Sequence, residues 1–255
     1  MEFRKIAALG CLAVAGLLAA GSAKASGFTG FYVGGNIGSA LGRSDATTTN
    51  VAGDYFASTS VTAIAAAGAQ KLSSSNVTGS GHAGFDLQAG GFVVGVEGEF
   101  GYLGVSENQS TTEDYPCCAP TAFTVSQSMK SEWELGVRPR AGVTISRALI
   151  YVTGGLAATD LNYQEMFTDT YDSALETGGV KKTAVGWTVG GGVELRLVHH
   201  LAARVEYLYD DFGRVSTTST NFEIGTPPSA DPTPVFTMSA NDRVNVVQFG
   251  LDYRF

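Results

Sequence analysis

The chain of 255 residues carries 24 acidic side chains against 16 lysines and arginines, a net charge of −8, and this balance gives no support to nucleic-acid binding. Its 33 glycines show no three-residue period, which excludes a collagen triple helix. After the first 25 residues no run of 18 apolar residues occurs, so the sequence predicts no transmembrane helix there.

The N-terminal residues have the pattern of a secretory signal peptide. Arg4 and Lys5 precede an apolar stretch over residues 6–20, and Ala23 and Ala25 supply the small residues of a cleavage site. The apolar stretch is too short for a membrane anchor helix, which is the competing interpretation. We therefore predict that residues 1–25 are removed on export and that residues 26–255 form a single domain.

Large apolar residues alternate with polar residues or glycine along the rest of the chain. Trp187 and Val189, for example, alternate with Thr188 and Gly190. This period of two places the two sets of side chains on opposite faces of an extended strand. The pattern predicts eight strands, at residues 29–41, 77–90, 91–106, 131–146, 148–162, 181–198, 201–214 and 241–255.

The predicted connections between these strands alternate in length. Tight turns at residues 90–91, 146–147 and 199–200 alternate with four long segments rich in Ser, Thr, Asp, Glu and Pro. This arrangement is typical of an all-β fold, an eight-stranded antiparallel up-and-down transmembrane β-barrel with four long extracellular loops and short periplasmic turns.

A soluble β-sandwich would show the same alternation. We favour the barrel because the apolar rows carry aromatic residues near strand ends, such as Trp133, Trp187 and Tyr207, where membrane barrels place their aromatic girdles. Pro139 lies inside a predicted strand and has no N–H to donate to the ladder, so we expect a local bulge there.

The last predicted strand, in VNVVQFGLDYRF, continues the alternation to the final residue. Its apolar row is Phe249, Leu251, Tyr253 and Phe255, and the polar row between them includes Asp252 and Arg254. Such a strand suits a wall whose apolar face meets lipid, because at a free sheet edge it would promote aggregation.

Several segments resemble a known family: FTGFYVGGNIG, GHAGFDLQAGGFVVGVEGEFGY, VGWTVGGGVE, RVEYLYDDFG and the ending FGLDYRF. They are similar to the small outer-membrane β-barrel proteins of alphaproteobacteria, porin-like surface antigens related to the OmpA membrane domain and the opacity proteins. The resemblance implies location in the cell outer membrane of a Gram-negative bacterium. It also implies that the assembly machinery reads a C-terminal signal at Phe249, Leu251, Tyr253 and Phe255.

The polar rows of the predicted strands carry charges of both signs. An eight-stranded barrel is just wide enough for its side chains to fill, so we predict a plugged interior held by ion pairs. A narrow charge-lined pore is the alternative. The predicted interior network is Glu97, Glu99, Glu134, Arg138, Arg140, Glu194, Arg196, Arg204, Glu206, Asp252 and Arg254.

A second set of charges falls where predicted strands meet long loops. These bases would lie level with the phosphates of lipopolysaccharide at the outer rim. The set is Arg43, Lys71, Lys130, Lys181, Lys182, Arg214 and Arg243. The loop acids Glu165, Asp169, Asp172 and Glu176 are predicted to be solvated and to attract cationic partners.

The sequence gives little support to catalysis. His82, His199 and His200 stand in no recognisable catalytic motif, and we predict no enzyme, cofactor or metal site. The neighbours Cys117 and Cys118 could form a strained vicinal disulfide, stay as free thiols or bond to another molecule.

The predicted function is therefore a structural and surface-interaction role: envelope integrity, lipopolysaccharide contact, adhesion or an antigenic surface. The expected partners are outer-membrane lipid and lipopolysaccharide, the outer-membrane assembly machinery, and an extracellular or host ligand at the loops. A narrow porin-like channel for small solutes or ions is the alternative function.

Overall fold

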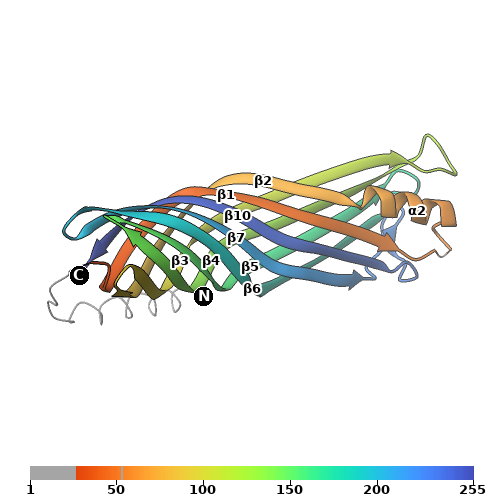
Figure 1. The fold of residues 1–255 in the computed structure, drawn as a ribbon. Helices are drawn as coiled ribbons and strands as arrows, with labels where there is room; N and C mark the ends of the chain where they lie inside the picture. Colours follow the sequence, from red (N-terminus) through yellow and green to blue (C-terminus); the bar gives the residue numbers. More distant parts are fainter. Residues whose placement is uncertain (1–26, 53) are drawn as a thin grey trace.

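The computed structural model of the chain describes residues 27–52 and 54–255, so the predicted signal peptide lies outside the described residues. Helix α2 (Ser58–Ala67) connects the first two strands, and the two-residue strands β8 (Glu223–Ile224) and β9 (Ser229–Ala230) lie in the last connection. Eight long strands carry the fold (Figure 1): β1 (Gly30–Asn50), β2 (Gln70–Ala89), β3 (Phe92–Asp114), β4 (Ala122–Ile145), β5 (Ala148–Asp169), β6 (Leu175–Val198), β7 (Leu201–Ser219) and β10 (Phe236–Arg254).

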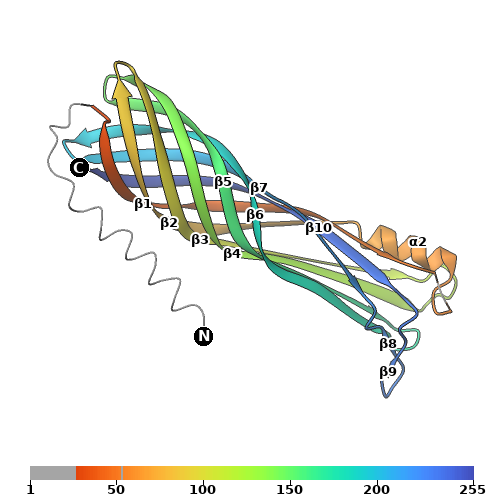
Figure 2. The same ribbon diagram turned by 90° about the horizontal axis from the view of Figure 1, so that it is seen from below.

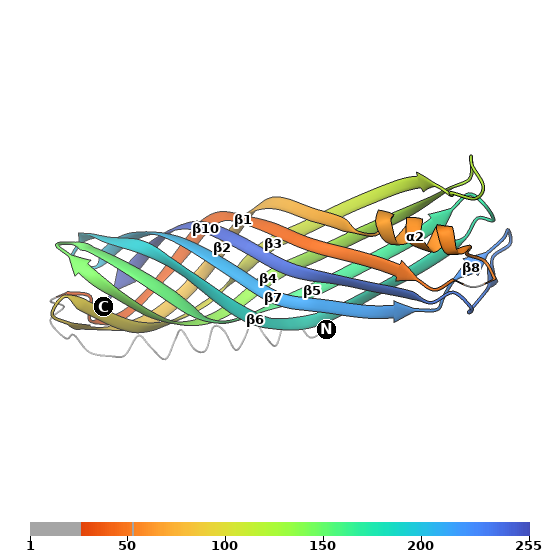
Figure 3. The same cartoon turned by 45° about the vertical axis from the view of Figure 1, so that its right-hand side comes forward.

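The long strands close into a ring. Each pairs antiparallel with its neighbours in the chain, β10 pairs with both β7 and β1, and β5 pairs with β6. The predicted eight-stranded antiparallel barrel is therefore confirmed. Tight turns join β2 to β3, β4 to β5 and β6 to β7, and Gly90 takes the positive φ of 62° that the first of these turns requires. The C-terminal end of β10 lies at the same end of the barrel as these turns, opposite α2 (Figure 3).

The strands are longer than predicted, because they continue through segments that we predicted to be long loops. The first strand was expected to end at residue 41 and ends at Asn50, and the last begins at Phe236 rather than at residue 241. In β4 and β6 the added segments are residues 122–130 and 175–180. The prediction of four long loops was wrong to this extent: much of their length is β-strand.

The added segments leave the barrel and form two facing sheets. Pairing between β2 and β3 stops at Gly79 and Tyr102, and pairing between β6 and β7 stops at Trp187 and Asp211. All other neighbouring strands stay paired further along. Beyond the two splits, β2, β1, β10 and β7 form the first sheet, and β3, β4, β5 and β6 form the second sheet. Figure 2 shows the strands running on toward α2 on one side and β8 and β9 on the other.

We call the closed ring the barrel and the region of two facing sheets, with α2, the extension. The barrel comprises residues 31–41, 77–89, 92–102, 133–145, 148–159, 184–198, 201–211 and 244–254. The extension comprises strand segments 43–50, 70–76, 105–114, 122–131, 161–169, 175–183, 212–219 and 236–243.

The barrel exposes an apolar outer face. Alternate residues on every strand project outward and are about half exposed, whereas their neighbours project into the lumen. A wall with this exterior is suited to hydrocarbon rather than to water. Outward residues include Ile37, Val77, Phe92, Val94, Phe100, Leu135, Val152, Leu156, Val185, Val193, Val205, Phe249 and Leu251.

The extension has the opposite polarity. Its outward residues are mainly Ser, Thr, Asn, Gln, Lys and Arg, whereas its inward residues form a continuous apolar core between the two sheets. Phe167 of the second sheet packs against Phe236 of the first with ring centroids 5.3 Å apart, and Phe56 before α2 lies 5.7 and 5.8 Å from the same two rings. Other core residues are Ile64, Leu72, Phe123, Val125, Met129, Leu161, Val215 and Met238. The extension is thus built like a water-soluble β-sandwich.

The bulge expected at Pro139 is absent, because Val137 pairs with Leu156 and Arg140 with Thr153 in one unbroken register. The two residues between them, 138 and 139, have no partner on β5. The missing N–H of Pro139 therefore costs a ladder hydrogen bond but does not shift the strand.

No helix within residues 27–52 and 54–255 is long and apolar enough to cross a membrane.

Candidate functional site

The end of the lumen nearest the tight turns is filled by a four-membered ion cluster. Arg140 donates from Nε to Asp86 at 2.8 Å and from Nη2 to Glu194 at 3.3 Å. Arg254 bonds the same two acids, Glu194 at 2.7 Å and Asp86 at 2.8 Å. Both guanidinium groups lie over the ring of Tyr32, at 4.4 and 4.8 Å from its centroid. Two acids and two bases thus neutralise one another.

A second cluster fills the middle of the lumen. Arg204 donates to Glu97 at 2.6 Å. Arg138 donates to Glu97 at 3.1 Å and to Glu99, and its guanidinium lies 3.7 Å from Glu206. Neutral partners complete the cluster. Tyr32 donates a hydrogen bond to Glu97 at 2.8 Å, and Tyr151 and Gln248 donate to Glu206 at 2.9 and 2.8 Å.

The three carboxylates of this cluster lie close enough to surround a cation. One oxygen from each of Glu97, Glu99 and Glu206 falls within 4.8 Å of the others. Arg138 already contacts all three, and Arg204 contacts Glu97 as well. The guanidinium groups therefore supply the positive charge that a metal ion would otherwise bring.

The remaining lumen residues leave little open space. Beside Glu99 and Glu134, the cavity has a volume of about 10 Å³, the space of one water molecule. His82 contacts Asp252 at 2.6 Å deep in the wall. Of the described lumen acids, Asp210 and Glu134 form no ion pair. The two clusters nevertheless fill the lumen with side chains, and this arrangement favours a plugged barrel over a pore.

The structure places the predicted interior residues in the lumen, eight of them buried and Glu99, Glu134 and Arg196 half-buried. Arg196 donates to the carbonyl of Gly27 rather than to an acid. Our sequence reasoning missed Tyr32, Tyr151 and Gln248 as partners of the charges. Their signal was position, since all three fall on the inward rows.

The seven predicted rim bases are all exposed on the extension. Six lie next to the barrel segments, where the polar surface meets the apolar band, whereas Lys71 lies near the far end of β2. On the first sheet Arg43 lies opposite Arg243, which contacts Asp211 at 3.3 Å and Asp45 at 3.8 Å. On the second sheet Lys130 lies opposite Asn162, and Asn162 opposite Lys181. In the described part of the chain, no ion pair involves Lys71, Lys130, Lys181 or Lys182. Arg214 donates to the hydroxyl of Ser239 at 3.0 Å.

The predicted solvated loop acids are mostly inside the extension, which corrects the prediction. Glu165 and Glu176 are 3% and 0% exposed, Asp169 is nearly buried, and only Asp172 is exposed. They point inward because their strands continue the alternation, and inward residues here enter the core. Glu107 of β3 is buried in the same core.

The buried acids of the extension lack cationic partners. Every buried Arg or His of the described chain lies in the barrel. Glu165 accepts hydrogen bonds from the hydroxyls of Thr48 and Tyr163 instead. Burial raises the pKa of Glu165 and of Glu107 to about 7, and it also raises the pKa of Glu176.

The other predicted residues lie at the two ends of the molecule. Cys117 and Cys118 form a disulfide in the turn between β3 and β4, at the far end of the extension. Phe249, Leu251, Tyr253 and Phe255 project outward at the opposite end, and β10 closes the ring through its pairing with β1.

Comparison with known proteins gives consistent results. Residues 10–255 match the family described as "Outer membrane protein beta-barrel domain". The chain is 32% identical over 129 residues to a 22 kDa outer membrane protein of Rhizobium leguminosarum bv. viciae, covering 51% of this chain and 49% of that protein. It is 34% identical over 140 residues to a 31 kDa outer-membrane immunogenic protein of Brucella melitensis, covering 51% and 57%. The chain thus spans about half the length of the curated relatives it matches.

Two solved structures also match over most of the chain, at low sequence identity. Neisserial surface protein A matches with a TM-score of 0.36 and 12% identity, over 90% of this chain and 100% of that one. Ail of Yersinia pestis matches with a TM-score of 0.33 and 12% identity, over 87% and 99%.

Proposed function

This chain belongs to the outer-membrane protein β-barrel family, and from that premise we propose that it is a closed structural protein that holds a folded domain above the outer membrane. The observation that carries the proposal is the reversal of polarity along each long strand. The barrel is apolar outside and charged inside, whereas the extension is polar outside and apolar inside. One half of each strand therefore suits lipid and the other half suits water.

The proposed orientation places the extension on the cell surface. The tight turns and the C-terminal end of β10 lie at the opposite end of the barrel. In barrels of this class short turns face the periplasm, and longer connections face the exterior. Phe249, Leu251, Tyr253 and Phe255 would then stand at the periplasmic end, where the assembly machinery would read them.

The rim bases support a role in the outer leaflet. All of them except Lys71 stand at the upper border of the apolar band, where anionic lipid headgroups would surround the barrel. We propose that these bases contact lipopolysaccharide phosphates and so tie the barrel into the envelope. The folded extension would offer a rigid surface for adhesion or immune recognition, in keeping with relatives that are named immunogenic.

Surface labelling of intact cells tests the orientation. In a background with Cys117 and Cys118 changed to serine, Thr237→Cys is expected to react with a membrane-impermeant maleimide, because residue 237 is exposed on the extension. Val152→Cys, which is 67% exposed on the barrel wall, is the matched control and should stay unlabelled in lipid. Equal labelling of the two variants, or labelling of neither until cells are lysed, would contradict the proposal.

The alternative function, a narrow pore, makes a different prediction. Because Arg138, Arg140, Arg204 and Arg254 bridge the lumen acids, we expect the refolded protein to leave a planar lipid bilayer silent. Folding would be checked by the gel shift on heating. A reproducible ion current that changes with Glu97→Gln would show an open lumen and favour the channel.

The geometry also gives no support to catalysis by lumen groups. Most acids there are held by guanidinium groups, Asp210 is fully buried, and His82 is buried against Asp252. A general acid or base needs to reach its substrate, and these groups have no access to one. We therefore propose a non-enzymatic role.

A further inference from the structure

The outer face of the second sheet carries an ordered array of neutral polar side chains. Residues that pair across β3, β4, β5 and β6 form four rows, each two residues further from the membrane. The rows are Ser106–Lys130–Asn162–Lys181, Asn108–Ser128–Gln164–Gly179, Ser110–Ser126–Met166–Thr177 and Thr112–Thr124–Thr168–Leu175.

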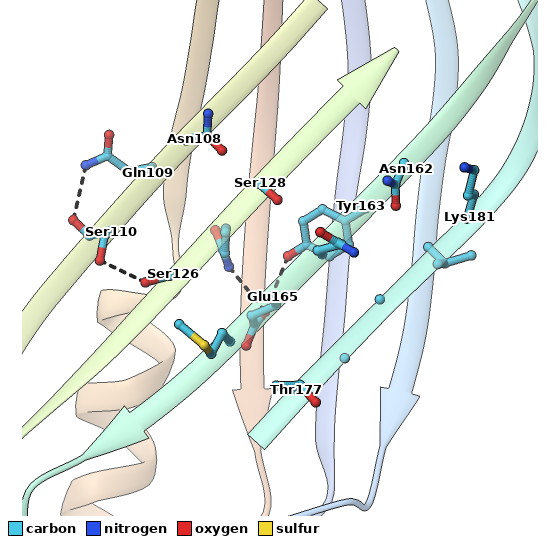
Figure 4. Close-up of a pocket in the computed structure, with 16 residues that line it drawn as sticks. Asn108, Gln109, Ser110, Ser126, Ser128, Asn162, Tyr163, Glu165, Thr177 and Lys181 are labelled. Carbon is cyan, nitrogen blue, oxygen red and sulfur yellow. Dashed lines mark hydrogen bonds between the residues drawn. The ribbon is translucent and has the colours of Figure 1, made fainter. Parts of the chain in front are cut away.

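This face is hollowed. A depression of about 1100 Å³ lies over the second and third rows, and Asn162 and Lys181 of the first row border it. Figure 4 shows Asn108, Ser128, Asn162 and Lys181 projecting from the four neighbouring strands around it. The hydroxyls of Ser110 and Ser126 bond to each other at 2.9 Å on the same surface. Few of the other polar side chains in these rows make hydrogen bonds to the protein, so they are free to bond a ligand.

The charges of the array lie only in the row nearest the membrane. Lys130 and Lys181 flank Asn162 there, and none of the sixteen positions in the four rows is acidic. The nearest acids are Glu132 and Asp160, each two residues closer to the membrane than the lysine row, and Asp114, two residues beyond Thr112. Neither Lys130 nor Lys181 forms an ion pair with them. Lysine ammonium groups bind phosphate as point charges, and hydroxyl and amide groups match the hydrogen-bonding groups of neutral sugars.

The dimensions fit a lipid-linked oligosaccharide. From Lys130 to Thr124 the strand rises six residues, about 20 Å at about 3.3 Å per residue. A phosphorylated lipid in the outer leaflet presents its phosphate at the border of the apolar band and its sugars above it. The lysine row and the polar rows occur in that same order.

We propose that the outer face of the second sheet binds the oligosaccharide of a phosphorylated glycolipid of the outer leaflet. The phosphate is held between Lys130 and Lys181, and the sugars lie along the Ser, Thr, Asn and Gln rows. This inference rests on the proposed surface orientation and adds a specific site to the general contact of the rim bases.

The first sheet provides an internal comparison. Its outer face also carries hydroxyls, such as Thr47, Thr49 and Ser239, but Arg243 is held there by Asp45 and Asp211. Hydroxyl pairs occur on both faces, Thr47 with Ser239 at 2.8 Å here and Ser110 with Ser126 at 2.9 Å on the second sheet, so the difference between the faces lies in the charges. The carboxylates beside the bases make this face a poorer phosphate site.

The test is a binding titration on the folded full-length barrel in detergent micelles. The probes are lipopolysaccharide with its core oligosaccharide and lipid A without it. Changing Lys130 and Lys181 together to Gln is expected to weaken binding of both probes about tenfold or more, because two charge-assisted contacts are lost. The comparison variant, Arg43→Gln with Lys71→Gln, removes equal charge from the first sheet. It loses only the general rim contact and should weaken binding of both probes by about threefold, clearly less than the Lys130 and Lys181 pair.

A second variant isolates the sugar contacts. Ser126→Tyr with Ser128→Tyr fills the hollow and leaves both lysines, so it should abolish the preference for core-bearing lipopolysaccharide and leave lipid A binding unchanged. Equal effects of the two charge pairs, or no preference for the core in the unaltered protein, would overturn the inference. Those results would leave the maleimide labelling of Thr237→Cys unaffected, so failure here is distinct from failure of the proposed orientation.

Discussion

Arg138→Met is expected to destabilise the barrel by about 3–5 kcal/mol, the cost of leaving buried charges without their partner. The guanidinium of Arg138 contacts Glu97, Glu99 and Glu206, and its side chain is 1% exposed. Methionine keeps the unbranched apolar stem but carries no charge. Glu97 would keep Arg204, whereas Glu99 and Glu206 would lose their ion-pair partner. Urea unfolding of the protein in lipid vesicles, followed by the gel shift on heating, measures the loss.

Two further variants separate charge from packing. Adding Glu99→Gln to Arg138→Met removes one uncompensated carboxylate and should recover part of the lost stability. Arg43→Met removes an exposed base and should cost less than about 1 kcal/mol. If Arg138→Met costs no more than Arg43→Met, ion pairing is not what fills and holds the lumen.

The sequence predicted the barrel well because lipid imposes a strong period of two. Phe249, Leu251 and Tyr253 could face only lipid or a core, and the charges between them could face only a lumen or water. The ring order and the inward positions of Arg138 and Glu206 follow from that alternation. The particular partners do not, since Tyr32 and Tyr151 reach acids on other strands.

The extension was missed because its alternation is weaker and because the residues that face inward change parity between the barrel and the extension. Phe123, Val125 and Met129 alternate with Thr124, Ser126 and Ser128, a strand pattern hidden among many Ser and Thr residues that resemble loop composition. The register also shifts between Ser131 and Glu134 of β4 and near Gly213 of β7. In β4 the odd-numbered residues face outward in the barrel and inward beyond that shift. The alternation of apolar and polar residues therefore does not continue in step along the whole strand.

The choice between barrel and sandwich assumed one architecture for the whole chain. The molecule uses both, because the same eight strands pass from lipid into water. Where the surroundings change, the outward side chains change from Leu135 and Val137 to Ser126 and Ser128, and the sheet splits to enclose an apolar core. Glu165 and Glu176 were therefore assigned to solvent when the core contains them.

Those buried acids make the extension sensitive to pH. The pKa of Glu165 is raised by burial to about 7 from an ordinary value of 4.5, so the folded state holds its proton over a range in which the unfolded chain has released it. The stability linked to this proton is fully present below pH 4.5 and is lost as the pH rises through about 7. The full loss is about 3 kcal/mol for one such group.

Raising the pH from 5 to 8 is thus expected to loosen the extension and leave the barrel closed. Amide hydrogen exchange of residues 161–169 and 175–183, in the folded protein, should become faster at pH 8 than the intrinsic pH effect explains. Glu165→Gln keeps a carbonyl acceptor for the Thr48 hydroxyl and has no proton to lose, so it should slow this exchange at pH 8 and change little at pH 5. The exposed Glu113→Gln is the control. Identical pH profiles for Glu165→Gln and the unaltered protein would show that Glu165 stays ionised in the core, compensated by water or by a cation.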